Sequence, residues 1–352
     1  MGRLKKILLW SLAGIGAAAG GLILTGRAFS APRYQGPVTD HFDGRRFHNL
    51  TPVPHSTAAF LKWMANREQG WWPSFVESEP GAGPPARVGP DELRITFVNH
   101  ATVLIQFDGV NVLTDPIWSN RTSPVPFAGP RRRRPPGIRF EDLPPLDAVV
   151  VSHNHYDHMD APTLRRIAAR DAPAIFVALG NDRFLEKKSI GPALALDWWE
   201  SRPLPNGIRL WAVPAQHFSA RGASDRDANL WCGFVLESAA GEAVYFAGDT
   251  GEGPHFEMIA KRFPSIRLAV LPIGAFLPRW FMAPVHIGPE EAIRAHRTLG
   301  ARRSMVMHFG TFPLGDDGID EAPQLLRTLL RNVPRSGRPD IWIPEQGESR
   351  EF

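Results

Sequence analysis

Cysteine is almost absent from the 352-residue chain, which contains only Cys232. A single cysteine cannot form an intramolecular disulfide, and it leaves no thiolate cluster of the kind that holds many structural zinc ions. Any metal ion bound by this chain must therefore be held by histidines and carboxylates. The sequence also lacks an internal repeat, a low-complexity tract and a composition break that would mark a second globular domain.

A strong excess of either charge is missing as well. The chain has 40 lysines and arginines and 36 aspartates and glutamates, so its formal net charge is +4. This mildly basic balance does not by itself indicate nucleic-acid binding, and no separate nucleic-acid-binding domain is visible, so we expect no nucleic-acid partner. It favours contact with anionic surfaces or substrates, including phospholipid headgroups. The apolar fraction of 43% is typical of a globular protein with a buried core.

Residues 1–30 differ from the rest of the chain. Basic residues at positions 3, 5 and 6 precede an apolar run from Ile7 to Gly26, which matches the ~20 residues that a helix needs to cross a bilayer. The charge asymmetry predicts a cytoplasmic N-terminus and an extracytoplasmic, periplasm-like location for the bulk of the chain. Ala28-Phe29-Ser30 has the small-x-small form of a signal-peptidase site. We therefore expect either a membrane anchor, which the length favours, or a signal peptide whose cleavage gives a secreted protein.

Residues 31–90 are expected to form an extended linker and an N-terminal helical extension. Residues Ala31 to Leu50 are polar and aromatic without clear periodicity, and Thr57–Arg67 has a helical pattern. Glu77–Pro90 is rich in proline and glycine and is expected to be a loop. Strand patterns then begin at Leu93, so we assign residues 91–352 to one α/β domain.

Apolar, β-branched segments alternate with helical patterns through residues 91–352, which predicts sheets covered by helices on their outer faces. The expected strands are Leu93–Phe97, Thr102–Phe107, Val110–Thr114, Asp147–Val151, Ala174–Val177, Ile208–Val213, Trp231–Glu237, Ala243–Ala247, Leu268–Leu271, Ser304–Met307 and Asp340–Ile343. The expected helices are Ala161–Arg170, Asp182–Lys188, His255–Arg262, Pro289–Leu299 and Ala322–Arg331.

The most informative stretch joins a predicted strand to a group of metal ligands. The apolar segment Val149–Val151 is followed closely by His153-x-His155-x-Asp157-His158. Side chains at the first and third positions of an extended turn project to the same side, so His153 and His155 can reach one ion. Asp157 and His158 lie at the next bend and can reach a second ion. Burying three histidines and an aspartate together without a metal ion would cost folding free energy. Imidazoles and carboxylates without thiolates suit zinc, and also iron or manganese.

Three predicted strands further along the chain end on residues of the same types. His217 follows the strand that ends near Val213, Asp249 stands in a Gly-Asp-Thr sequence, and His308 follows the strand that ends at Met307. Each residue alone is unremarkable, because a single buried histidine is more often structural than a ligand. Together with the first motif they predict a site of five histidines and two aspartates.

The order His-x-His-x-Asp-His, His, Gly-Asp-Thr, His resembles that of the metallo-β-lactamase superfamily. The resemblance covers nearly the whole chain after the linker. Several further motifs look like those of the N-acylphosphatidylethanolamine-hydrolysing phospholipase D family, although the apolar N-terminal run departs from the animal enzymes. They are Leu113–Ile117, Ser152–His158, Leu196–Glu200, Phe246–Gly251, Pro278–Met282 and Gly347–Arg350.

This resemblance implies a four-layer αβ/βα sandwich and a pair of zinc ions, which would follow the N-terminal hydrophobic helix expected from the sequence. It implies a phospholipase D that cleaves the phosphodiester of a membrane phospholipid. One zinc ion would be held by His153, His155 and His217, and the other by Asp157, His158 and His308, with Asp249 bridging the two.

The resemblance also implies roles for residues around the ions. Asp115 stands where the superfamily keeps a carboxylate that supports the ligands. His286 matches a histidine near the family's active site, where it would contact the phosphate or assist the leaving group. Asp157 and Asp249 could also hold or accept a proton of the attacking water.

Some features are consistent with a lipid substrate but have simpler explanations. Arg131 and Arg132 begin a basic run that could attract an anionic surface or form a solvated loop. Trp280 and Phe281 could lie at a membrane interface or pack in the interior. We expect a membrane-associated enzyme acting on a phospholipid, and the sequence also allows a homodimer.

Two other functions remain open at this point. A lactonase or another small-ester hydrolase of the same fold would have a similar ligand order. A membrane-anchored metal-binding protein of the cell envelope, without catalysis, is the alternative of a different class.

Overall fold

The computed structural model describes residue 26, residues 28–54 and residues 57–352. The apolar run predicted as an N-terminal hydrophobic helix lies, except for Gly26, outside the described residues. Within the described chain, none of the helices combines the length and the apolar character that a bilayer crossing requires.

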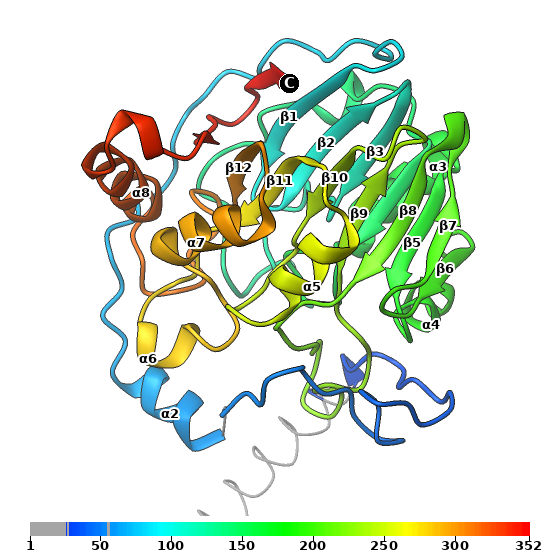
Figure 1. The fold of residues 1–352 in the computed structure, drawn as a ribbon. Helices are drawn as coiled ribbons and strands as arrows, with labels where there is room; N and C mark the ends of the chain where they lie inside the picture. Colours follow the sequence, from blue (N-terminus) through cyan, green and yellow to red (C-terminus); the bar gives the residue numbers. More distant parts are fainter. Residues whose placement is uncertain (1–25, 27, 55–56) are drawn as a thin grey trace, which may run out of the picture.

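Two mixed sheets of seven strands each form the centre of the molecule (Figure 1). The strands of the first sheet, in spatial order, are β14 (Ser349–Glu351), β1 (Leu93–Asn99), β2 (Thr102–Phe107), β3 (Val110–Thr114), β4 (Ala148–Val151), β5 (Ala174–Ala178) and β6 (Ala193–Leu196). Those of the second are β13 (Ile341–Trp342), β12 (Arg303–Met307), β11 (Ile266–Pro272), β10 (Ala243–Phe246), β9 (Gly233–Glu237), β8 (Arg209–Val213) and β7 (Ser201–Pro203).

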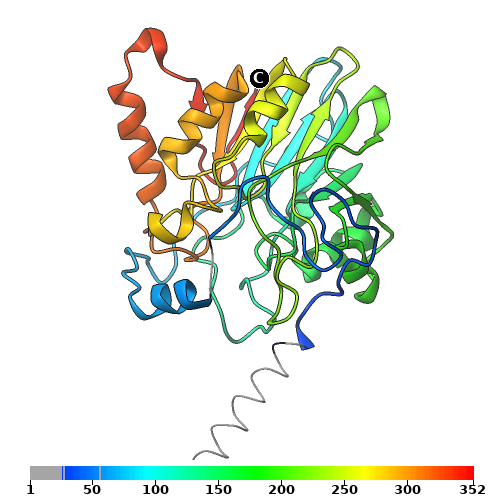
Figure 2. The ribbon, with the colours of Figure 1, turned by 60° about the horizontal axis from the view of Figure 1, so that its bottom comes forward.

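Helices cover the outer faces of both sheets. On the first sheet lie α3 (Ala161–Asp171) and α4 (Asp182–Lys187), and on the second lie α5 (His255–Arg262), α7 (Pro289–Leu299) and α8 (Glu321–Asn332). Two further helices, α2 (Thr57–Ala65) and α6 (Arg279–Met282), contact each other at one end of the sandwich (Figure 2). The described chain therefore has the expected αβ/βα arrangement.

Strand β4 shows how a continuous apolar run serves two layers at once. Val150 belongs to the core between the two sheets, together with Phe234 and Phe246 of the second sheet. Val149 and Val151 belong instead to the core beneath α3. Because successive side chains of a strand point to opposite faces, a strand covered on both faces is apolar at every position.

The segment between residues 31 and 51, which we call the strap, lies against the domain without regular secondary structure. The sequence predicts an extended linker here, and in the structure two of its side chains reach the interior. Phe42 and Phe47 are almost completely buried in the core between the sheets. The ring of His41 stacks on Trp198 at 4.5 Å, and its Nε2 lies 2.7 Å from Oδ1 of Asp197.

Candidate metal centre

All seven predicted ligands meet at one edge of the sandwich. Four of them follow β4 directly, and the other three follow β8, β10 and β12. Strands of both sheets end here, so residues far apart in sequence are brought within a few ångströms. The ligands are His153, His155, Asp157, His158, His217, Asp249 and His308.

Three histidines form the first group. Nε2 of His153 lies 2.8 Å from Nδ1 of His155, which in turn lies 3.3 Å from Nε2 of His217. Burial lowers the pKa of His153 well below its usual value and lowers those of His155 and His217 to about 3. The rings are therefore neutral near pH 7, which is the form that binds metal ions. This is the set expected to hold one ion.

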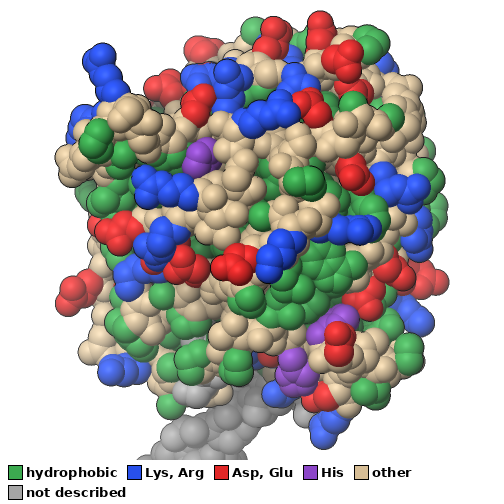
Figure 3. Space-filling model, in the orientation of Figure 1, with side chains coloured by type: hydrophobic (Ala, Val, Ile, Leu, Met, Phe, Trp, Pro, Cys, Tyr) green, Lys and Arg blue, Asp and Glu red, His purple; other side chains and the backbone are tan. Residues whose placement is uncertain are grey.

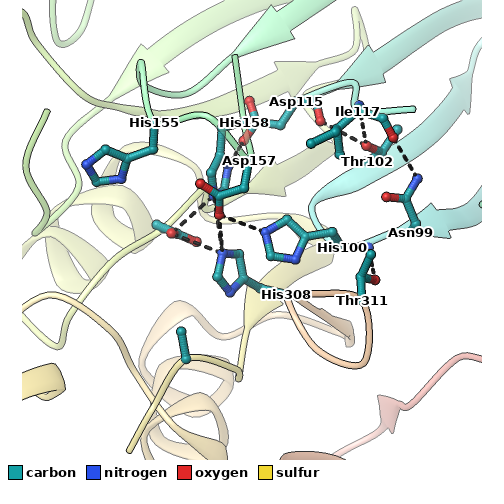
Figure 4. Close-up of polar contacts among 12 residues, drawn as sticks. Asn99, His100, Thr102, Asp115, Ile117, His155, Asp157, His158, His308 and Thr311 are labelled. Carbon is teal, nitrogen blue, oxygen red and sulfur yellow. Dashed lines mark hydrogen bonds and ion pairs between the residues drawn. The ribbon is translucent and has the colours of Figure 1, made fainter. Parts of the chain in front are cut away.

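The second group consists of an aspartate and two histidines around it. Nε2 of His158 lies 3.2 Å from Nε2 of His308 and 3.2 Å from Oδ2 of Asp157. Nε2 of His308 lies 3.4 Å from the same carboxylate oxygen. Figure 4 shows these side chains pointing toward one another from separate segments of the chain. This is the set expected to hold the other ion.

Asp249 lies between the two groups. Its Oδ2 is 3.2 Å from Nε2 of His158, 3.2 Å from Nε2 of His308 and 3.8 Å from Nε2 of His217. Its Oδ1 is buried and has no hydrogen-bond partner among the described residues. A buried carboxylate oxygen without a partner is costly unless it binds a cation. The position of Asp249 is thus that of a bridging ligand.

Carboxylates determine the protonation of the second group. Burial alone would lower the pKa values of His158 and His308, but neighbouring negative charges outweigh it. Asp249 and Asp157, with the buried Asp115, raise the pKa of His158 well above its usual value. Asp249 and Asp157 raise that of His308 to about 9. Both histidines must release a proton before they can bind a cation through that nitrogen.

Asp115 holds His158 in place from behind, as expected of a supporting carboxylate. It is completely buried, and its Oδ2 accepts hydrogen bonds from Nδ1 of His158 at 2.6 Å and from Oγ of Ser152 at 2.6 Å. Its Oδ1 accepts from the backbone N–H of Ser152 at 2.7 Å. Because Nδ1 of His158 carries the proton in this arrangement, Nε2 is directed toward the site.

His100 is a member of the site that the sequence analysis missed. It lies in the turn between β1 and β2 at φ 46°, and its Nε2 is 2.8 Å from Oδ2 of Asp157. Its backbone carbonyl accepts a hydrogen bond from the backbone N–H of His308 at 2.8 Å. His100 therefore contacts two of the three members of the second group. A lone histidine in a hairpin turn gave no spacing signal that could have found it.

His286 lies beside the cluster, as predicted. Its Nδ1 is 3.8 Å from Oδ2 of Asp249 and has no hydrogen-bond partner among the described residues. The loop is fixed by Arg279 at the start of α6, whose Nη1 donates to the carbonyl oxygen of His286 at 3.1 Å. Burial lowers the pKa of His286 to about 3, so the ring is uncharged near neutral pH.

The residues predicted to contact lipid have different environments. Arg131 is exposed, but Arg132 is only 3% exposed and donates to Asn99 and to the carbonyl oxygens of Ile117 and Ser119. The guanidinium of Arg132 thus binds interior groups, and the prediction that Arg132 contacts a lipid is wrong because the side chain is buried.

The two aromatic residues of α6 also differ from each other. Trp280 is 52% exposed, with the ammonium of Lys62 5.1 Å from its ring centre. Phe281 stacks on Trp63 of α2 at 4.9 Å, so it contributes to the packing of the two helices. Of this pair, Trp280 is the residue that faces outward.

The donor set fits a pair of transition-metal ions. It consists of imidazoles and carboxylates without a thiolate, and each of the two groups brings its donor atoms to within 4.8 Å of one another. Zinc, iron and manganese all accept such ligands. The neutral nitrogens of the first group, a bridging carboxylate with an unpaired oxygen and supporting residues behind the ligands suit a two-ion centre.

Comparison with known proteins agrees with this geometry. The chain is 43% identical over 231 residues to N-acyl-phosphatidylethanolamine-hydrolyzing phospholipase D 1 of Caenorhabditis elegans, a match that covers 62% of this chain and 64% of that protein. It is 29% identical over 343 residues to a mitochondrial N-acyl-phosphatidylethanolamine-hydrolyzing phospholipase D of Saccharomyces cerevisiae, covering 90% of this chain and 73% of that protein. The match to the nematode relative thus spans less than two thirds of that relative's length.

A solved structure supports the fold alone. Igni18, a metallo hydrolase from Ignicoccus hospitalis, superposes with a TM-score of 0.55 at 24% identity, covering 74% of this chain and 98% of that one. The family described as "Beta-lactamase superfamily domain" matches residues 110–309, a range that includes all seven ligands. Taken with the arrangement of histidines and aspartates, this match shows that the chain belongs to the metallo-β-lactamase superfamily.

Proposed function

We propose that this protein is a zinc-dependent phospholipase D that hydrolyses N-acylphosphatidylethanolamine-type lipids at a two-ion centre. The observation that carries the proposal is the position of Asp249, whose Oδ2 lies within 3.8 Å of ligands from both groups. Two relatives whose names specify this activity supply the substrate class.

The protein's own residues prepare the site for attack by water on phosphorus. When bound, two divalent cations supply Lewis acidity that lowers the pKa of a water and offsets charge on the phosphoryl oxygens. Asp115 and His100 hold His158 and Asp157 in position, so little reorganisation is needed. Asp157 and Asp249 are placed to accept the proton that water releases.

His286 is suited to the substrate side of the reaction. Its free Nδ1 faces the centre near Asp249, and its low pKa keeps the ring neutral. A neutral imidazole can donate one hydrogen bond to a phosphoryl or leaving-group oxygen. For a phospholipase D, the bond that breaks joins phosphorus to the headgroup alcohol, which leaves phosphatidic acid and an N-acylethanolamine.

A membrane location belongs to the same proposal. The apolar run of residues 7–26 would hold the enzyme at the bilayer, with the domain on the extracytoplasmic side or released after cleavage. Exposed Trp280 with Lys62, and exposed Arg131, supply side chains that favour a phospholipid surface. Dimerisation remains a prediction from the sequence.

The test is mass spectrometry of lipids after incubating the full-length protein with mixed membrane phospholipids. We expect phosphatidic acid and N-acylethanolamine to appear, to disappear on chelation and to return with zinc. Asp249→Asn should abolish turnover, because the bridging ligand loses its charge. Asp340→Asn, at an exposed aspartate paired with Arg303, is the matched control and should behave like the wild type.

The outcomes separate the alternatives. Lactone opening without phospholipid cleavage would favour the small-ester hydrolase. Stoichiometric zinc binding without turnover of phosphodiesters or lactones would favour the non-catalytic envelope protein. Product formation that survives complete chelation would contradict the proposed chemistry.

A further inference from the structure

A large cavity adjoins the ligand motif at Tyr156 and is lined by none of the metal ligands. Its volume is about 650 Å³. Tyr156, which stands between two metal ligands in sequence, lines it together with residues that follow β3, with α3, with α4 and with residues 28–30, which precede the strap. The cavity therefore shares the ligand loop with the centre but none of the seven ligands themselves.

Positive charge dominates the walls of this cavity. They carry five basic side chains and one carboxylate, Asp160. That carboxylate is itself buried and accepts hydrogen bonds from Ser119 and Thr163. No carboxylate of the described residues forms an ion pair with any of the five cations, which are Arg121, Arg165, Lys187, Lys188 and Arg221. On the face shown in Figure 3, by contrast, acidic and basic side chains lie interspersed.

Arg221 is the buried cation in the wall of the cavity. It is 8% exposed, and its guanidinium lies between the rings of Tyr156 and Phe184, at 4.0 and 4.2 Å from their centres. Its Nη1 donates to the carbonyl oxygens of Asn154 and Met159, at the two ends of the ligand loop. Its Nε is buried without a partner among the described residues. A buried donor without an acceptor is costly, so an acceptor supplied by water or by a bound group would stabilise Arg221 here.

We propose that this cavity binds a phosphate group, at a site separate from the metal centre. Arginine and lysine side chains without carboxylate partners are the usual recognition elements for phosphate, and Arg221 is the buried member of the set. An anion there would contact the residue that braces the loop from Asn154 to Met159. Phosphate bound to Arg221 would thereby also stabilise the loop that carries three of the metal ligands.

The surroundings favour a phosphate carried by a lipid over a free one. Phe29, Val125 and Phe184 give the basic cavity apolar walls. Phe29 also follows the apolar run of residues 7–26 closely in sequence, so a bilayer-inserted run would bring the opening near lipid headgroups. A headgroup phosphate could enter the basic part while its glycerol backbone contacts the apolar part.

The experiment compares phosphate binding by the zinc-loaded full chain and two variants in detergent. Lys187→Gln/Lys188→Gln removes two exposed cations of the cavity, whose side chains form no hydrogen bond or ion pair with the described residues. Lys261→Gln/Arg297→Gln removes the same charge from exposed positions on α5 and α7. Because all three proteins keep the same metal centre, a difference between them isolates the cavity.

Calorimetric titration with inorganic phosphate and glycerol 1-phosphate gives the first readout. In the Lys187/Lys188 variant, the dissociation constant for one bound phosphate should rise at least about tenfold over that of wild type. The control variant should have the wild-type constant. Hydrogen exchange on binding should slow in residues 119–126 and 184–188. Equal affinity in all three proteins, or protection confined to the metal ligands, would overturn the proposal.

Native mass spectrometry distinguishes the two sources of phosphate. Retention of phosphatidylglycerol but not phosphatidylcholine by wild type, with loss in the Lys187/Lys188 variant, identifies a lipid headgroup. Binding of the soluble phosphates without lipid retention identifies a free phosphate and still supports the site. These measurements do not depend on turnover, so they test the phosphate site independently of the proposed phospholipase activity.

Discussion

The side-chain amide of Asn49 pairs with both backbone polar groups of His217. Its Nδ2 donates to the carbonyl oxygen at 2.7 Å, and its Oδ1 accepts from the backbone N–H at 2.9 Å. A neighbouring contact runs in the opposite direction, from a side chain of the domain to the backbone of the strap. In it, Nε2 of Gln216 donates to the carbonyl oxygen of Thr51 at 2.6 Å. The strap thus fixes the backbone of one member of the first ligand group.

Removing this clamp should loosen the first group. Asn49→Ala leaves both backbone groups of His217 without their side-chain partner and removes one of the two acceptors of the Trp231 indole N–H, which we expect to cost about 2 kcal/mol of unfolding free energy. Metal should also be lost faster during dialysis, with the ion of the first group leaving first. Asn66→Ala, at an exposed asparagine, is the control and should retain metal like wild type. Normal retention in Asn49→Ala would show that the strap does not position His217.

Removing the side chain of His100 should weaken metal binding by the second group. His100→Ala removes the hydrogen bond to Asp157, and such supporting partners contribute about tenfold or more to metal affinity. We expect one of two ions to dissociate at lower chelator concentration, while the group with His217 keeps its ion. Cobalt substitution followed by visible spectroscopy can report the two sites separately. Equal weakening of both sites would argue against a local role.

Asp115→Asn should weaken binding without removing a ligand. The amide can still accept one hydrogen bond, but it loses the negative charge that supports the ring of His158. We expect metal affinity to fall about 10- to 100-fold, measured by competition with a chromogenic chelator. The same change at exposed Asp340 serves as the control. An affinity equal to that of wild type would exclude the supporting role.

The strap should respond to pH through His41. Burial opposes protonation of His41, but hydrogen bonds to Asp197 and Asp40 outweigh it and raise its pKa above 6.5. The protonated form therefore stabilises the folded state fully below the unfolded pKa, and this contribution is lost as pH rises through the folded pKa. Solvent screening keeps it small, about 1 kcal/mol.

Urea unfolding of wild type and His41→Gln measures this contribution. The difference in unfolding free energy should be larger at about pH 5 than at about pH 9, because the contribution is lost as pH rises through the folded pKa. Asp197→Asn in both backgrounds should reduce the difference. A difference that grows with pH would contradict the sign of the proposed coupling.

The sequence predicts much of this fold because the strongest patterns are local. The strands Thr102–Phe107 and Val110–Thr114 and the helices His255–Arg262 and Pro289–Leu299 have the predicted bounds. Each has clear apolar periodicity, with a turn or cap beside it. Other predicted elements differ by one or two residues at their ends, as fraying termini do.

The elements that were missed depend on tertiary contacts. Strand β6 reads Ala-Leu-Ala-Leu, without a β-branched residue, and pairs with β5. Strand β7 contains Pro203, and the polar β14 pairs with β1 at the sheet edge. Backbone pairing with an existing strand defines these segments, and composition does not reveal it.

The residues of the site likewise divide into those with a local sequence pattern and those placed only by tertiary contacts. His153, His155, Asp157 and His158 could be found because they occur together, and the other ligands because they follow predicted strands. His100 and Asn49 stand alone in a turn and in an irregular segment, 57 and 168 residues from the ligands that they contact. Only the folded arrangement brings them to the centre.

The number of metal ions per folded chain tests the central claim most directly. Elemental analysis of protein stripped by chelation and reloaded with zinc should give two ions per chain, and about one in His100→Ala at limiting zinc. Protein that is folded by circular dichroism but retains no transition metal after reloading would contradict the account, since its histidines and aspartates would then share no cation.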